Sequence, residues 1–126
     1  MNFTVQVNKP FDQILKEIES LAEKHSFRVQ HIHRVSDILN EKGFQIENYS
    51  IVELCNPRFA HLVLSQDKNF GSILPCKILV YEKDGRNFIS APDPVEMIEK
   101  LGMNQISDVA KQVERIIKEI IIEVSQ

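Results

Sequence analysis

Several features that mark common protein classes are missing from this sequence. Its four glycines are scattered and none are paired, so there is no glycine-rich loop of the kind that cradles nucleotide phosphates. Fifteen basic residues are intermixed with 18 acidic ones, which gives a net charge of −3 and no basic stripe. This balance argues against nucleic-acid binding, and the missing loop argues against the usual nucleotide enzymes.

Long apolar runs are also absent. The first residues lack the basic and apolar segments of a secretory signal. The longest apolar cluster, IIKEIIIEV near the C-terminus, is interrupted by charges and is too short to cross a bilayer. We therefore expect a cytoplasmic protein without a membrane segment. In that reducing compartment the only two cysteines, Cys55 and Cys76, are expected to be free thiols.

The composition that remains is that of an ordinary globular domain. The chain has 126 residues, of which 43% are hydrophobic and 26% are charged. This length holds one core and leaves no room for a second, so a single domain over residues 1–126 is predicted.

Hydrophobic periodicity predicts the order of the elements, because alternation is typical of strands and spacings of three and four are typical of helices. Strands are predicted at residues 2–7, 27–34, 46–55, 74–82 and 86–91. Helices are predicted at residues 10–25, 35–43, 57–67, 94–102 and 106–124. Asp84-Gly85 is a hairpin signal between the last two strands.

This order predicts an α+β fold, in which a mixed or antiparallel sheet of about five strands carries helices largely on one face. The strand at 27–34 is expected to place Phe27, Val29, His31 and His33 on the same face. Between the third and fourth strands the chain inserts a helix and a loop where a tight turn is usual. Insertions of this kind often build pockets.

The junction at Cys55 is the first candidate site. Asn56 suits the N-cap of a helix and Pro57 its first residue. The partial positive charge of a helix N-terminus stabilises a nearby thiolate, so Cys55 is a candidate nucleophile, with Glu53 as a candidate base. The alternative is that Cys55 is a small buried residue that fills space beside the cap. Cys76 opens the next strand and is predicted to line the same pocket.

His31 and His33 are the second candidate site. They lie two residues apart on a strand, so both rings point the same way, a common arrangement for two ligands of zinc or a similar metal. A third ligand would have to come from Glu53, Cys55, His61 or a neighbouring chain. The alternative is a pair of half-buried histidines at the sheet edge.

Three segments carry a family likeness: ELCNPRFAHLVL, LPCKILVYEKDG and ISAPDP. Through them the chain resembles the bacterial and archaeal family called domain of unknown function 302, over nearly its whole length. The resemblance implies a compact TATA-binding-protein-like domain, β-α-β4-α in outline, and a homodimer. It implies no activity, and the histidine pair is not part of the motif. The shared positions are Glu53, Cys55, Asn56, Pro57, Ala60, Leu74, Pro75, Cys76, Val80, Tyr81, Gly85 and Pro94.

Three functions are open at this point. The first is a dimeric module that binds a small molecule or a soft metal in a pocket formed by Cys55, Asn56, Pro57 and Cys76, under the inserted segment 56–72. The second is a thiol-dependent enzyme or redox-active protein that uses Cys55. The third is a structural or partner-binding domain in which both thiols belong to the core. None of them involves nucleic acid or a membrane.

Overall fold

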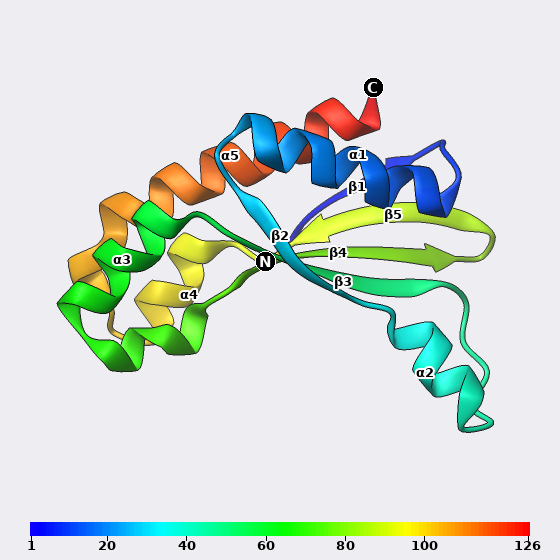
Figure 1. Cartoon of the computed structure of the whole chain (residues 1–126), viewed down its shortest axis with the longest axis horizontal. Coiled ribbons are helices and arrows are strands. Elements are labelled where there is room, and N and C mark those ends of the chain that lie inside the picture. Colours follow the sequence, from blue (N-terminus) through cyan, green and yellow to red (C-terminus); the bar gives the residue numbers. More distant parts are fainter.

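Five strands form one antiparallel sheet in the computed structural model, which describes residues 1–126 (Figure 1). The strand order is β1-β5-β4-β3-β2, so β1 and β2 are the edges. Every neighbouring pair is antiparallel, which decides between the two sheet types predicted from the sequence. The strands are β1 (Phe3–Val7), β2 (Arg28–His33), β3 (Tyr49–Cys55), β4 (Cys76–Lys83) and β5 (Arg86–Ala91).

The helices occupy three places around this sheet. α1 and α5 cover one face, α3 and α4 lie together beyond one end of the strands, and α2 projects from the opposite end (Figure 1). The α+β fold and the predicted order of elements are therefore confirmed; the two short 3-10 helices were not predicted. The helical segments are α1 (Phe11–Lys24), α2 (Val35–Glu41), α3 (Pro57–Gln66), η1 (Lys68–Ile73), α4 (Pro94–Lys100), η2 (Asn104–Ile106) and α5 (Ser107–Ser125).

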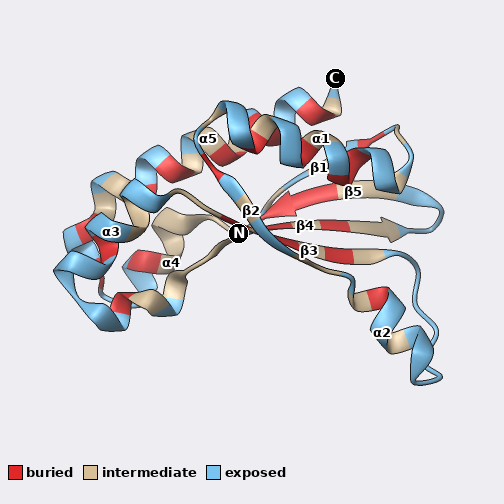
Figure 2. Ribbon diagram, in the orientation of Figure 1, coloured by how far each residue is buried: buried red, intermediate tan, exposed pale blue.

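The core is divided into two hydrophobic clusters. The main cluster of 17 buried residues lies between the sheet and helices α1 and α5. A second cluster of six lies among α3, η1, α4, η2 and the start of α5 (Figure 2). α5 joins the two clusters because its 19 residues extend over roughly 28 Å, at about 1.5 Å per residue. The second cluster consists of Val63, Phe70, Ile98, Met103, Ile106 and Ala110.

Strand β2 corrects one prediction. Its register shifts between Val29 and His31, as in a β-bulge. Val29 therefore packs against the core, whereas His31 and His33 lie on the face that no helix covers. The prediction that these three residues share one face was wrong. An extra residue at a bulge inverts the alternation that follows it, and here it brings Ile32 to the core.

The uncovered face of the sheet is partly aromatic. The rings of Tyr49 and Tyr81 stack with centroids 5.8 Å apart, and those of Tyr81 and Phe88 stack at 5.5 Å. An arm, which we define as residues 35–48, projects from the end of the sheet where β2 ends and β3 begins. Ser36 anchors the arm to β3, since its Oγ accepts a hydrogen bond from the Tyr49 N–H and donates one to the Tyr49 carbonyl.

Candidate functional site

The Asn56-Pro57 junction is a helix start. Asn56 has extended backbone angles and its Oδ1 accepts a hydrogen bond of 3.1 Å from the Phe59 N–H. Pro57 then provides the first residue of α3, where its missing N–H costs nothing. These two residues turn the chain from β3 into α3. The turn lies beside a space between the two core clusters.

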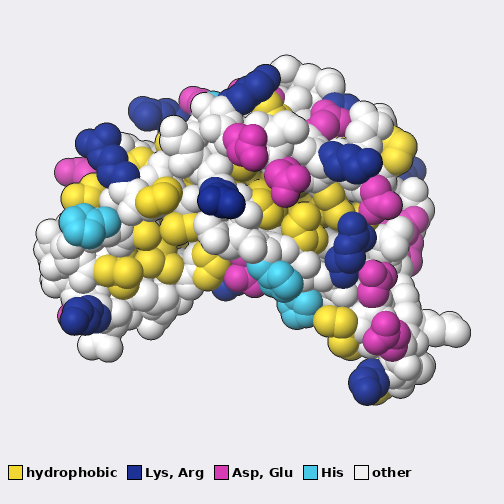
Figure 3. Space-filling view, viewed as in Figure 1, with side chains coloured by type: hydrophobic (Ala, Val, Ile, Leu, Met, Phe, Trp, Pro, Cys, Tyr) yellow, Lys and Arg dark blue, Asp and Glu magenta, His cyan; other side chains and the backbone are white.

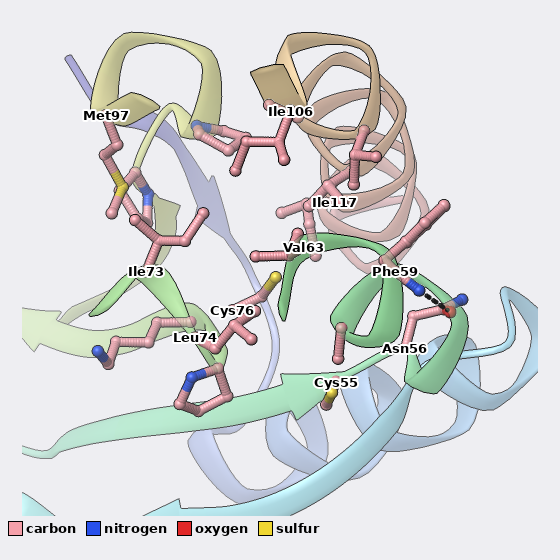
Figure 4. Close-up of a pocket in the computed structure, with 18 of the residues that line it drawn as sticks. Cys55, Asn56, Phe59, Val63, Ile73, Leu74, Cys76, Met97, Ile106 and Ile117 are labelled. Atoms are coloured by element: carbon pink, nitrogen blue, oxygen red, sulfur yellow. Dashed lines mark hydrogen bonds between the residues drawn. The ribbon is translucent and has the colours of Figure 1, made fainter. Parts of the chain in front are cut away.

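A cavity of about 100 Å³ occupies that space (Figure 4). Twenty residues line it and 14 of them are hydrophobic. They come from the ends of β3 and β4, from α3, from the segment around η1, and from α4 and α5. In Figure 4, Val63 and Ile117 face Ile73 and Met97 across the space. The cavity is therefore an apolar space between helices at the end of a sheet, a usual setting for small-molecule sites.

Three of the four predicted pocket residues line this cavity: Cys55, Asn56 and Cys76. Pro57 does not; it is exposed on α3. Cys76 pairs with Leu54 on the helix-covered face and packs against the main core cluster. Cys55 follows Leu54 and alternation directs it to the opposite face, so the two thiols reach the cavity from different sides of the sheet.

Burial controls the acidity of both thiols. Burial and, to a smaller extent, the nearby Cys55 raise the pKa of Cys76 to about 11, although Lys77 acts in the opposite direction. Burial also raises the pKa of Cys55. The sequence suggested that the N-terminus of α3 would stabilise a Cys55 thiolate and so lower its pKa. The pKa is raised instead. Both thiols are protonated near neutral pH and are poor nucleophiles there.

Glu53 lies on the uncovered face of the sheet. Its strand neighbours there are His31 and Lys77, in register across β2 and β4. It forms no ion pair, and it is not among the residues that line the cavity. The structure thus gives Glu53 no hydrogen bond through which it would act as a base toward either thiol.

The two histidines of β2 lie close together. The rings of His31 and His33 are stacked with centroids 6.1 Å apart, and Glu53 lies opposite His31. Yet no group of three or more His, Cys, Asp or Glu residues is placed to hold a metal ion. His61 is exposed on α3. Within one chain the predicted pair therefore lacks the third ligand that a zinc site needs.

Much of the cavity wall comes from residues that the sequence did not single out. α4 contributes Met97, and α5 and its preceding turn contribute Ile106, Val113 and Ile117. Their helical spacing predicted that the α5 residues face a core. This spacing does not predict where the core leaves a cavity, because the position of the cavity depends on how α3 and α4 pack beyond the sheet.

No helix of the chain combines the length and the apolar character that a membrane crossing requires.

Comparisons with known proteins agree with this fold. No curated protein matches the sequence. A crystal structure described as an uncharacterized conserved protein DUF302 from Bacillus stearothermophilus is similar, with a TM-score of 0.92 and 25% sequence identity over 99% of this chain and 98% of that one. The family model "Domain of unknown function DUF302" matches residues 3–124, so the chain belongs to this family.

Proposed function

We propose that this domain is a binding module whose cavity takes a small, mainly apolar molecule. The observation that carries the proposal is the cavity wall, which is apolar at 14 of 20 residues and lies where the two core clusters fail to meet. Apolar cavities lined by aliphatic and aromatic side chains bind small apolar molecules. The burial of apolar ligand surface supplies the favourable free energy.

Thiol chemistry is the weaker candidate. An enzyme that attacks through Cys55 needs a thiolate, whereas burial raises the pKa of this residue and no hydrogen bond joins it to Glu53. A soft metal is also disfavoured, since Cys55 and Cys76 belong to opposite faces of the sheet and no other ligand joins them. The proposal therefore gives Cys76 the role of a neutral wall residue.

A cavity-filling variant tests the proposal. Ala60 lines the cavity from α3, and Ala60→Leu adds three carbons to that wall. Ser65→Leu adds an apolar side chain at an exposed position of the same helix and serves as the matched control. With 1-hexanol as the probe, NMR titration should give saturable shifts in the wild type and Ser65→Leu, and at least fivefold weaker binding in Ala60→Leu. Equal binding by all three proteins would contradict the proposal.

We also propose that two copies associate through the uncovered face of the sheet and the arm. Three apolar residues of the arm are strongly exposed: Ile38 (48%), Phe44 (65%) and Ile46 (40%). The arm stands away from the helices, and hydrophobic side chains show on its surface beside the two histidines (Figure 3). Clustered apolar exposure of this kind marks contact sites more often than isolated exposed residues do.

Light scattering tests the association. We expect the wild type to have the mass of a dimer and Phe44→Asp to have that of a monomer. Leu101→Asp changes an equally apolar residue, 55% exposed, at the opposite end of the molecule and should remain dimeric. A monomeric wild type at about 100 μM, or loss of the dimer in both variants, would refute the choice of this surface; stable complexes normally bury roughly 800 Å² per partner and persist at that concentration.

Two free thiols in one small domain fit a reducing compartment, and a cytoplasmic location is part of this proposal. Fractionation of the native host, with thiol labelling before lysis, should recover the protein in the cytoplasm with both cysteines reduced. Recovery of an oxidised form from outside the cytoplasm would contradict it.

A further inference from the structure

One charged residue lines the cavity, and it is basic. Lys77 is the only charged member of the 20 lining residues, none of which is acidic. It is exposed and follows Cys76 at the start of β4, so it belongs to the mouth of the cavity rather than its interior. Lys77 forms no ion pair within the chain. Glu53 lies opposite Lys77 in the register of β3 and β4 but forms no ion pair with it, so the ammonium group at the mouth stays open to a further anionic partner.

The charge of Lys77 also acts on the interior. It lowers the pKa of the Cys76 thiol, against the larger effect of burial. A cation that influences a group on the cavity wall will also attract a negative charge held at the mouth. The long aliphatic part of a lysine adds apolar surface to the rim while its ammonium group stays in water.

We propose that the ligand is a short-chain carboxylate whose hydrocarbon tail enters the cavity and whose carboxylate stays at the mouth beside Lys77. This inference rests on the proposed binding function and adds the chemical class of the ligand. An engineered cavity of about 150 Å³ holds benzene. A cavity of about 100 Å³ therefore holds a chain of roughly four carbons, and an acid of about six carbons leaves its head group outside.

Other head groups fit less well. A cationic head would meet the ammonium group of Lys77 at the mouth and no acidic lining residue. A carboxylate placed deeper among Val63, Ile106 and Ile117 would lose its hydration without a partner. A neutral head group gains nothing from the charge. The combination of an apolar interior and a single exposed cation therefore selects an anionic, amphipathic chain.

NMR titration at pH 7 with hexanoate, 1-hexanol and hexylamine tests the inference, since the three probes share one tail and differ in head group. Hexanoate should bind about two- to fivefold more tightly than 1-hexanol, as expected for one exposed ion pair, and hexylamine more weakly than either. High salt should reduce the advantage of hexanoate.

Matched lysine variants give the decisive comparison. Lys77→Gln should lower the affinity for hexanoate to that for 1-hexanol and leave 1-hexanol unchanged. Lys83→Gln removes another exposed lysine without an ion pair, at the far end of β4, and should change neither affinity. Equal affinities of the wild type for hexanoate and 1-hexanol, or equal losses in both variants, would overturn the carboxylate assignment alone. Absence of binding by every probe would overturn the proposed function and this inference together.

Discussion

The two thiols should react with alkylating reagents more slowly than the same cysteines in the unfolded chain, whereas a catalytic cysteine would react faster. Only the thiolate reacts with an alkylating reagent. The pKa of Cys76 is raised from 9.0 to about 11, which lowers its thiolate fraction at pH 8 roughly a hundredfold, tenfold per unit. Cys55 should also react more slowly than in the unfolded chain, because burial raises its pKa as well.

The assay is iodoacetamide labelling across pH 6.5–10.5, followed by tryptic digestion and mass spectrometry. The cysteines fall in different tryptic peptides, residues 43–58 for Cys55 and 69–77 for Cys76. Protein unfolded in guanidinium chloride supplies the reference rates. The Cys76 rate should still rise tenfold per pH unit above pH 9, where an ordinary thiol levels off. This slope separates a raised pKa from simple steric exclusion, which slows the reaction equally at every pH.

The result that would refute this reasoning is a Cys55 rate that is flat between pH 6.5 and 8 and exceeds that of the unfolded chain. Such a result would mean that the pKa of Cys55 is lowered and that the N-terminus of α3 outweighs burial.

The raised pKa of Cys76 also predicts a stability change. The folded protein holds this proton more tightly than the unfolded chain, so stability is complete below pH 9 and falls by about 2–3 kcal/mol as the pH rises to 11.

Three further predictions concern the fold around the site. Asn56→Ala removes the acceptor for the cap of α3 and should lower the free energy of unfolding in urea by about 1 kcal/mol, whereas Asn56→Asp should restore most of it. Lys9→Met removes hydrogen bonds to Glu17 and to the Val124 carbonyl and should cost about 1 kcal/mol at pH 7. The hydrogen bond from Lys9 lowers the pKa of Glu17, so this cost should shrink as the pH falls below 4.5; an undiminished cost at low pH would contradict the pairing. Ser36→Ala should increase amide hydrogen exchange in residues 35–48 and leave α3 unchanged, because only the arm loses its anchor.

The sequence was sufficient for the order of elements because each depends on local signals. Alternation, helical spacing, the Asp84-Gly85 turn and the Asn56-Pro57 cap all act within a few residues. The cap of α4 is local in the same way, since Asp93 accepts hydrogen bonds from two backbone N–H groups within the first turn of that helix. The resemblance over the cysteine motifs led to the same fold, and the family match over residues 3–124 confirms the family.

Features that depend on distant contacts were not predictable. The bulge in β2 is required by pairing with β3, so a pattern read along β2 alone placed the histidines on the wrong face. Leu62 lies on the helix of the inserted segment and is 42% exposed, because α3 packs beyond the sheet rather than flat on it. The cavity wall brings together α3 and α5, which lie about 50 residues apart along the chain. No local sequence pattern predicts that these two helices meet.

The central claim is that the space between the two core clusters is a binding site. Its most direct test is a ¹³C-edited NOE experiment with 1-hexanol on methyl-labelled protein. We predict NOEs from the probe to the methyl groups of Val63, Ile73 and Ile117, which face the cavity from three elements. NOEs confined to Ile51 and Leu79, on the uncovered face of the sheet, or no NOEs at all, would contradict the claim.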